Sequence, residues 1–289
     1  MKFNRRIPWM FLAPQLSLFC VFLVLPIAAI IGLSLFDWNL LGDHHFVGVG
    51  NYTEILSDRR FWHALRNTAV LSAVVVPVTT FAGFALAVAL NQPLPARNFF
   101  RAAIYLPTAI SAVASAQVAS WIFSEQYGVA NALLEVIGLP RVPWLSSPQY
   151  ALPTVIATTV WLRTGLCMVV YLAALQEVPQ NLLDAAALDG AGFFDRLRYV
   201  VWPLLKPTTT FLLITNIIYS LHLFDLIYVM THGGPAFSTA VLVQYLYDSA
   251  FREQREGYAS AISVILVVIL LVLTTFLLIN RRESRRKTA

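Results

Sequence analysis

Six long apolar stretches constrain what this chain can fold into more than any other feature. They lie at about 9–36, 68–90, 102–123, 151–175, 208–230 and 258–279. An α-helix rises ~1.5 Å per residue, so each stretch is long enough to cross a hydrocarbon core of ~30 Å. No water satisfies backbone polar groups there, so each stretch must be helical. With 58% hydrophobic residues and 12% charged ones, the 289-residue chain is predicted to be an all-α integral membrane protein with six transmembrane helices.

The basic residues predict how these spans are oriented. With six spans both termini lie on one side, and that side would carry 13 Lys and Arg residues against 6 in the opposite loops. Because basic loops stay in the cytoplasm, both termini and the segment 178–207 are expected there. The net charge of +5 reflects this bias, and no nucleic-acid partner is expected. The first stretch is too long for a signal peptide, so an uncleaved anchor is expected.

The segment 178–207 is the one long polar insertion that does not resemble a simple loop. Its sequence predicts a helix, a tight stop and a second helix; we refer to residues 178–207 as the helical loop. Asn181 is the expected N-cap, with Asp184 as the acid of a capping box. Three alanines at 185–187 favour helix without adding bulk. Gly190 is expected to supply the left-handed residue that ends the first helix.

The second half of the helical loop is expected to form another short helix. Four apolar residues would share one face of it: Phe193, Phe194, Leu197 and Val201. Pro203 and Pro207 are expected to end it, because proline lacks the N–H that continues a helix. The predicted result is a compact knob whose small residues allow another protein's surface to come close.

Several kinds of chemistry are missing from the sequence. It contains no G-x-x-x-x-G-K-[ST] loop to cradle a nucleotide, and no metal-ligand spacing of Cys and His. Only three ionisable residues fall well inside the spans: Arg163, His222 and Asp225. No catalytic constellation is present, which disfavours a membrane enzyme. A stand-alone secondary carrier usually needs more buried ionisable groups but remains an alternative. A pore subunit driven by a separate ATPase fits better.

The residues of the helical loop resemble the EAA loop of ABC importer permeases. They read Asp184-Ala185-Ala186-x-x-Asp189-Gly190-Ala191, with Val178-Pro179 before and Pro203 and Pro207 after. Further residues resemble the carbohydrate-uptake branch, and within it the first permease of the pair, of the maltose and glycerol-3-phosphate transporter type. They are Phe224-Asp225, Thr231-x-Gly233-Gly234-Pro235, Ser238-Thr239, Tyr245-x-Tyr247, Ala250-Phe251 and Gly257-Tyr258-Ala259. The resemblance extends back to Gly48-x-Gly50-Asn51-Tyr52.

This resemblance implies the type I ABC importer permease fold, with one transmembrane permease domain over residues 1–289 and a cytoplasmic helix-turn-helix coupling loop. It implies no enzymatic activity and no cofactor or metal in this chain, because ATP and Mg belong to a partner ATPase. The implied partners are a second homologous permease, two ATP-binding subunits, an extracytoplasmic solute-binding protein and membrane lipid. The implied location is the cell membrane of a prokaryote. Sugar import is favoured, and a glycerol phosphodiester or an amino-acid-like solute remains an alternative.

The resemblance, together with the polar residues inside the spans, gives two sets of site residues. Coupling to the ATPase is assigned to Asp184, Ala185, Ala186, Asp189, Gly190 and Ala191. Asp184, one methylene shorter than the family's glutamate, would offer its carboxylate to a basic residue of the ATPase. The alternative is that Asp184 and Asp189 are ordinary helix caps on a solvated loop.

A substrate path is assigned to Arg163, Asn216, Tyr219, Ser220 and Leu223. Tyr219 either stacks on a sugar ring or packs between helices. Leu223 stands where the family can present an asparagine, which weakens a polar role there. Arg163 either lines the cavity, pairs with His222 or Asp225, or extends toward an interface.

Overall fold

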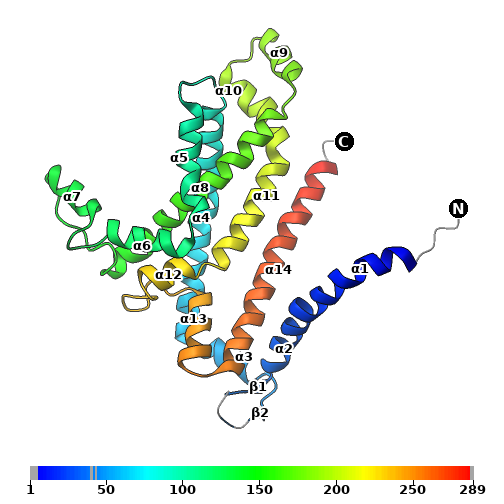
Figure 1. Ribbon diagram of the computed structural model, residues 1–289, viewed down its shortest axis with the longest axis vertical. Coiled ribbons are helices and arrows are strands. Elements are labelled where there is room, and N and C mark those ends of the chain that lie inside the picture. Colours follow the sequence, from blue (N-terminus) through cyan, green and yellow to red (C-terminus); the bar gives the residue numbers. More distant parts are fainter. Residues whose placement is uncertain (1–5, 40–41, 43, 287–289) are drawn as a thin grey trace. The chain divides into compact units, whose positions relative to one another are not determined.

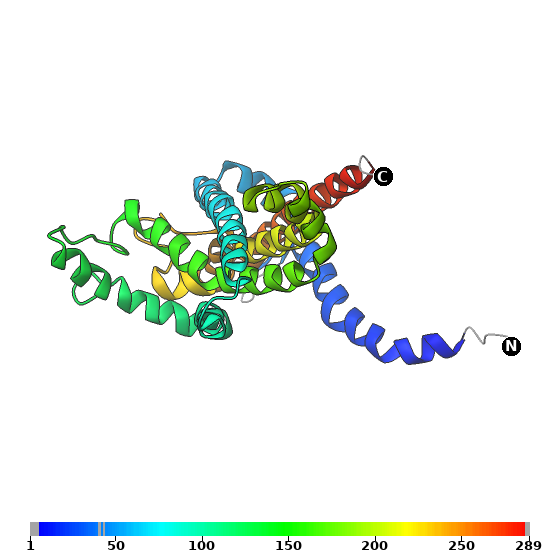
Figure 2. The ribbon, with the colours of Figure 1, turned by 90° about the horizontal axis from the view of Figure 1, so that it is seen from above.

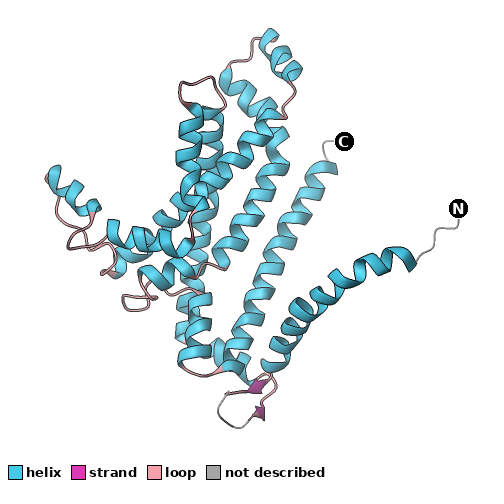
Figure 3. Cartoon of the chain, viewed as in Figure 1, coloured by secondary structure: helices cyan, strands magenta, loops and turns pink. Residues whose placement is uncertain are grey.

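The computed structural model describes residues 6–39, 42 and 44–286. Contacts divide the chain into two compact units, each built from two segments: Met1–Phe61 with Tyr245–Ile269, and Trp62–Gln244 with Leu270–Ala289. Figures 1 and 3 show that helices dominate both, and that one pair of short strands is the only sheet within the described residues. The chain is therefore all-α in architecture, as the apolar stretches predict.

The first unit is built from an N-terminal helical stretch, a two-stranded sheet and short helices. Its elements are α1 (Arg6–Phe19), the π-helical turn η1 (Cys20–Val24), α2 (Leu25–Leu33), β1 (Phe36–Asp37), β2 (His45–Phe46), α3 (Gly50–Ser57) and the π-helical turn η3 (Asp248–Arg252). The strands are antiparallel, with Phe36 opposite Phe46. Three helices have residues in both units: α4 (Arg59–Leu90), α13 (Leu242–Tyr247) and α14 (Glu256–Arg286).

Asn51 and Tyr52 hold the first unit together after the end of α2. The Asn51 amide donates to the carbonyl oxygens of Ser34 and Phe36, both at 2.9 Å. The Tyr52 hydroxyl donates to the Ser34 hydroxyl at 2.8 Å. Gly257 at the start of α14 is required by close approach, because a Cβ there would lie 2.0 Å from the Phe36 carbonyl oxygen. The glycine- and asparagine-containing motifs of the sequence therefore have structural roles here.

Asp58 forms a second tie within the same unit. Its carboxylate accepts hydrogen bonds from the hydroxyls of Tyr245 and Tyr258 and from the backbone N–H of Arg60. Burial raises the pKa of the Asp58 carboxyl, but these hydrogen bonds lower it more, so its pKa lies below the usual value. Burial and the hydrogen bond to Asp58 raise the pKa of Tyr245 to about 12. At neutral pH Asp58 is therefore a carboxylate, and the Tyr245 hydroxyl that donates to it is neutral.

The second unit contains most of the predicted spans. Besides its part of α4, it comprises α5 (Arg97–Ala109), α6 (Ala112–Ile122), α7 (Val129–Val136), α8 (Pro148–Gln176), α9 (Gln180–Leu188), α10 (Phe193–Arg196), the π-helical turn η2 (Leu197–Val201), α11 (Trp202–Leu221) and α12 (Asp225–Met230). Helices α5 and α11 both pack on α8, and Figure 2 shows this bundle from above.

Two apolar clusters form the core of this unit. The first joins α4, α6, α8 and α12 through buried residues such as Leu71, Val155 and Ile227. The second joins α4, α8 and α11 through residues such as Met168, Tyr171 and Leu212. Together they hold α8 at the centre of the bundle, because that helix contributes side chains to both.

Two glycines let the helices approach α8 and each other closely. A Cβ at Gly83 of α4 would lie 2.3 Å from the Cβ of Cys167, and one at Gly165 would lie 2.4 Å from the carbonyl oxygen of Ile104. Small residues at helix crossings are typical of membrane bundles. Thr108 of α5 adds a hydrogen bond of 2.7 Å from its hydroxyl to the Leu162 carbonyl oxygen. Both contacts involve backbone atoms, and together they fix which side of α8 lies against α5.

Helices lie in all six predicted ranges, but the first range extends past the end of α2 at Leu33 into β1, and two other ranges are interrupted. The range 102–123 was predicted as one span, and the structure bends it by 104° between α5 and α6. Pro107 lies in the last turn of α5, and Ile110 is extended, so the helix cannot continue across the bend. The range 208–230 is broken after Leu221. By length and apolar composition, the described part of the chain holds four candidate spans, or five with the bent pair as one.

Candidate functional site: a helical loop and a charged pocket

The first helix of the helical loop ends as Gly190 predicts. Gly190 has φ +81°, and a Cβ there would meet nothing within 4 Å. The left-handed backbone conformation, and not a lack of space, therefore favours glycine at this position. Two hydrogen bonds close the end, from the Ala191 N–H to the Ala186 carbonyl at 2.9 Å and from the Gly190 N–H to the Ala187 carbonyl at 3.1 Å. This pair defines a Schellman motif, which fixes the direction of the chain after α9.

The predicted N-cap at Asn181 is wrong. Helix α9 begins earlier, at Gln180, and Pro179 precedes it in an extended conformation. A proline fixes its own φ and restricts the residue before it, so it sets the helix start here. The capping box at Asp184 is also wrong, because its carboxylate accepts a hydrogen bond from the Gln180 side chain at 3.0 Å. The backbone N–H of Gly192 donates instead to the Asp195 carboxylate, at 3.3 Å, at the start of α10.

The prolines do not end the second helix, contrary to the prediction. Pro203 and Pro207 both lie within α11, which continues directly from α10 and η2. The π-helical turn η2 makes this possible, because its wider backbone places the Trp202 N–H on the Leu197 carbonyl, five residues back. A wider turn leaves room for the ring of Pro203, which would clash in a regular α-helix.

The residues assigned to coupling lie on the surface of the helical loop. Asp184, Ala185, Asp189 and Gly190 are exposed, whereas Ala186 and Ala191 are half-buried. Sequence reasoning missed Leu188, whose side chain is 90% exposed, and placed Phe194 on an apolar face although it is 79% exposed. Both side chains are therefore available for contact with an apolar surface of a partner. The position of Leu188 next to Asp189-Gly190 was the signal that could have identified it.

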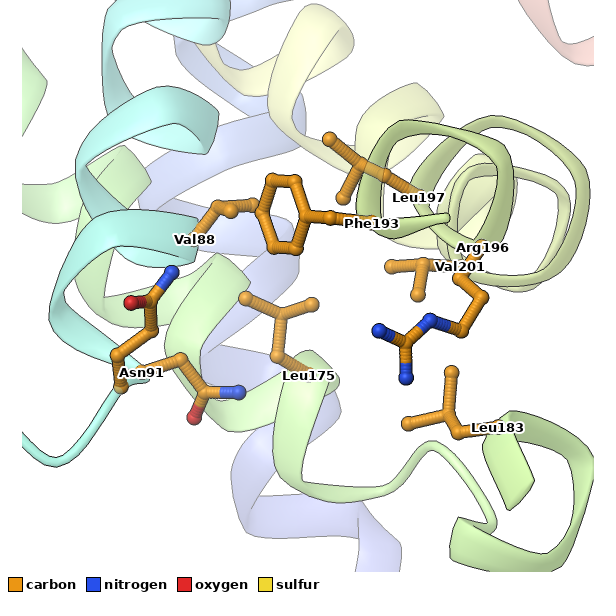
Figure 4. A pocket seen from close by; sticks show the side chains of 9 residues that line it. Val88, Asn91, Leu175, Leu183, Phe193, Arg196, Leu197 and Val201 are labelled. Carbon is orange, nitrogen blue, oxygen red and sulfur yellow. The ribbon is translucent and has the colours of Figure 1, made fainter. Parts of the chain in front are cut away.

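The inner side of the helical loop rests on the ends of α4 and α8 and leaves a pocket of about 180 Å³ (Figure 4). Phe193 and Leu197 of the loop lie opposite Val88 of α4 and Leu175 of α8. The remaining lining residues are Asn91, Gln92, Leu183, Arg196 and Val201. The helical loop is therefore attached through apolar contacts that are incompletely packed.

Arg163 and Tyr219 come together as a second candidate site. The guanidinium carbon of Arg163 lies 4.2 Å from the centroid of the Tyr219 ring, a cation–π contact between α8 and α11. Its Nη2 donates to the side-chain oxygen of Asn216 at 3.1 Å. Within the described residues Arg163 forms no ion pair with His222 or Asp225. Of the roles open to Arg163, the structure supports contact with a cavity.

That cavity is a pocket of about 130 Å³ beside the bend between α5 and α6. It is lined by Pro107, Thr108, Ile110, Ala112, Leu162, Arg163 and Tyr219. The bend itself makes room for it, because the chain turns away from α8 just after Thr108. Apart from Arg163, Thr108 and Tyr219, the side chains around it are apolar.

The other three residues assigned to the path are buried elsewhere. Asn216 is 1% exposed, and its amide nitrogen lies 3.2 Å from the Cys167 sulfur, near two threonine hydroxyls of α4. The hydroxyl of Ser220 donates to the Ser72 hydroxyl at 2.9 Å. Leu223 belongs to the first apolar cluster. None of the three lines the pocket with Arg163, and their part in a substrate path stays a prediction.

The bundle and its apolar helices are those of an integral membrane protein. Residues 79–287 match the model of the family described as "Binding-protein-dependent transport system inner membrane component". The chain belongs to this family, and its fold is that of a type I ABC importer permease.

Relatives and solved structures of ABC transporters align with nearly the whole chain. The trehalose/maltose transport system permease protein MalF of Thermococcus litoralis is 34% identical, with 90% of this chain and 88% of that protein covered. The lactose transport system permease protein LacF of Rhizobium radiobacter is 37% identical, with coverage of 90% and 88%. A crystal structure of a bacterial alginate ABC transporter in complex with an alginate pentasaccharide-bound periplasmic protein is 25% identical, with a TM-score of 0.85 and coverage of 98% and 95%.

Proposed function

We propose that this chain forms half of the translocation path of an ATP-driven importer for a sugar or sugar-like solute, and that the helical loop couples it to a separate ATPase. The exposed tip of the helical loop carries the proposal. There a Schellman motif at Gly190 holds small residues and the Leu188 side chain out into solvent. The sugar as solute is supported by the names of the relatives, which transport trehalose, maltose or lactose.

Coupling requires a rigid contact between the helical loop and the ATPase. The exposed methyl groups of Ala185 and Ala187 let a partner's backbone come close, and Leu188 offers it an apolar anchor. The Asp184 carboxylate, exposed and oriented by Gln180, is available to a basic side chain. Closure of the ATPase would then push on α9 and reach α8, which precedes the helical loop, and α11, which begins within it.

The proposed assembly has the composition that the ABC importer class implies. A second homologous permease supplies the other half of the path, and two ATP-binding subunits bind ATP and Mg and carry out hydrolysis. An extracytoplasmic solute-binding protein delivers the solute, and the chain itself catalyses no reaction. We place it in the cell membrane of a prokaryote with both termini in the cytoplasm, because basic residues concentrate on that side.

Co-purification followed by reconstitution tests this proposal. The tagged chain, extracted from its native membranes, is expected to retain a second permease and an ATP-binding subunit. Reconstituted with its binding protein in liposomes, the complex should take up a radiolabelled sugar only when ATP is present on the side of the helical loop. Uptake by the chain alone, driven by an ion gradient, would establish a secondary carrier and refute the proposal.

A further inference from the structure

Arg163 places a positive charge at the middle of a membrane-spanning helix. It lies 15 residues after Pro148 and 13 before Gln176, the two ends of α8. At ~1.5 Å per residue this is about 20 Å from either end of α8, which puts the charge near the middle of a ~30 Å hydrocarbon core. A cation at this depth is costly unless a counter-charge or water compensates it.

The chain supplies little of that compensation. Among the described residues Arg163 makes one hydrogen bond, to the neutral amide of Asn216, and takes part in no salt bridge. Its Nε is buried without a hydrogen-bond partner. The Tyr219 ring covers one face of the guanidinium but accepts no hydrogen bond from it. A guanidinium has five N–H donors, so most of the donor capacity of Arg163 is unused.

The surroundings of the pocket favour a small anionic group. The Thr108 hydroxyl donates to the Leu162 carbonyl, so its hydrogen is not available to a bound group. Pro107, Ile110 and Ala112 form apolar walls. Apolar walls lower the local dielectric and strengthen attraction to an anion. A volume of about 130 Å³ is below the ~300–1,000 Å³ of sites for whole small molecules. It suits one substituent of a larger solute.

We propose that the solute carries an acidic group, such as the carboxylate of a uronic acid or a sulfonate, and that Arg163 binds this group during passage. Asn216 and Tyr219 hold the guanidinium in place, so that its planar fork meets two oxygens of the anion. The inference rests on the proposed function, since it names the solute class of the same path. Neutral sugars would leave the charge of Arg163 uncompensated in the pocket and would pass less readily.

Matched pairs of probes test the inference on the assembled permease–ATPase complex, without its binding protein. The pairs are methyl glucuronide with methyl glucoside, and digalacturonate with its neutral digalactose counterpart. The readout is thermal stabilisation of the complex as a function of probe concentration. The wild type is expected to bind the acidic member of a pair at least ten times more tightly, because hydrogen bonds to a charged group are the strong ones.

Two variants separate charge from structure. Arg163→Gln removes the charge but keeps a donor for Asn216, and it should abolish the preference for the acidic probe. Asp225→Asn should keep the preference, because Asp225, the first residue of α12, forms no ion pair with Arg163 within the described residues. If Arg163→Gln does not assemble, Arg163→Lys keeps the charge and loses the fork, and the acidic preference should then fall several-fold.

The outcomes distinguish the two proposals. Equal stabilisation by both members of each pair, stabilisation by neither, or an unchanged preference in Arg163→Gln would overturn the inference. Loss of the preference in Asp225→Asn would do so too. ATP-dependent uptake of a neutral sugar by the wild type, with no competition from the acidic probes, would leave the proposed function intact and remove only the acidic group.

Discussion

Replacing Gly190 with alanine isolates the role of the Schellman motif in coupling. A side chain at φ +81° costs about 1–2 kcal/mol, because the Cβ crowds the carbonyl oxygen in a left-handed conformation. A Cβ there would meet nothing else within 4 Å, so no steric clash adds to this figure. Since about 1.4 kcal/mol corresponds to a factor of ten, opening of the α9 end should become roughly 5- to 30-fold more frequent.

Hydrogen exchange measures this opening directly. The amides of residues 190 and 191, which form the two bonds of the motif, should exchange faster by that factor in Gly190→Ala, whereas amides of α8 should not change. Solute-stimulated ATPase activity of the reconstituted complex should fall in parallel, because the partner meets a frayed helix end.

Gly138 provides a matched control. It has φ +76°, open space around its Cβ position, and the same pair of closing bonds at the end of α7. Gly138→Ala should therefore carry a similar local cost without affecting coupling. If both variants keep wild-type coupling, or both lose it equally, the motif at Gly190 has no specific part in transmitting the ATPase movement.

Three further predictions follow from the helical loop, the helix crossings and the hydrogen bonds of Asp58. The double variant Leu188→Ser, Phe194→Ser should weaken retention of the ATPase in pull-down at least tenfold, because each side chain loses ~1.5–3 kcal/mol of burial in the contact. The control Leu133→Ser, at an exposed position of α7, should leave retention unchanged. Gly165→Val should prevent accumulation of folded protein, since its Cβ would lie 2.4 Å from the Ile104 carbonyl oxygen, whereas Gly32→Val, with nothing within 4 Å, should accumulate normally in immunoblots of membranes. Because the pKa of Asp58 is lowered in the fold, its contribution to stability is complete above the unfolded pKa of about 4 and is lost as the pH falls through the folded pKa. The melting temperature should therefore drop over this pH range in the wild type, and less in Asp58→Asn.

Topology can be checked with single cysteines, in a variant without Cys20 and Cys167. A cysteine at Asp195, in the helical loop, should react only from the cytoplasmic face. One at Ser146, before α8, should react only from the outer face, because the basic residues concentrate on the helical-loop side. Labelling of both positions from the same face would contradict the orientation.

Sequence patterns predicted features whose cause is local. Gly190 was recognisable because few residues other than glycine adopt a left-handed conformation at a helix end, and the structure confirms it. The bend at Ile110 was not recognisable, since hydropathy measures apolar content and says nothing about direction. The helix start before Asn181 was misplaced because Pro179 outweighs a good capping residue.

The candidate pocket shows the same limit. Arg163 and Tyr219 could each be identified as unusual in an apolar span, and their contact came from helix packing. The hydrogen bond from Arg163 to Asn216 joins residues 53 positions apart. Which of several polar groups an arginine meets depends on how α8 and α11 are rotated, and no short-range pattern encodes that rotation.

The bend between α5 and α6 has a consequence for how the chain enters the membrane during synthesis. The two arms have 13 and 11 residues, or about 20 Å and 17 Å of helix, and neither can cross ~30 Å of hydrocarbon alone. The contacts that hold the longer arm come from α8, through the Thr108–Leu162 hydrogen bond and the close approach at Gly165. Because α8 is made later, the contacts that hold the longer arm cannot form until the fourth apolar segment has been synthesised.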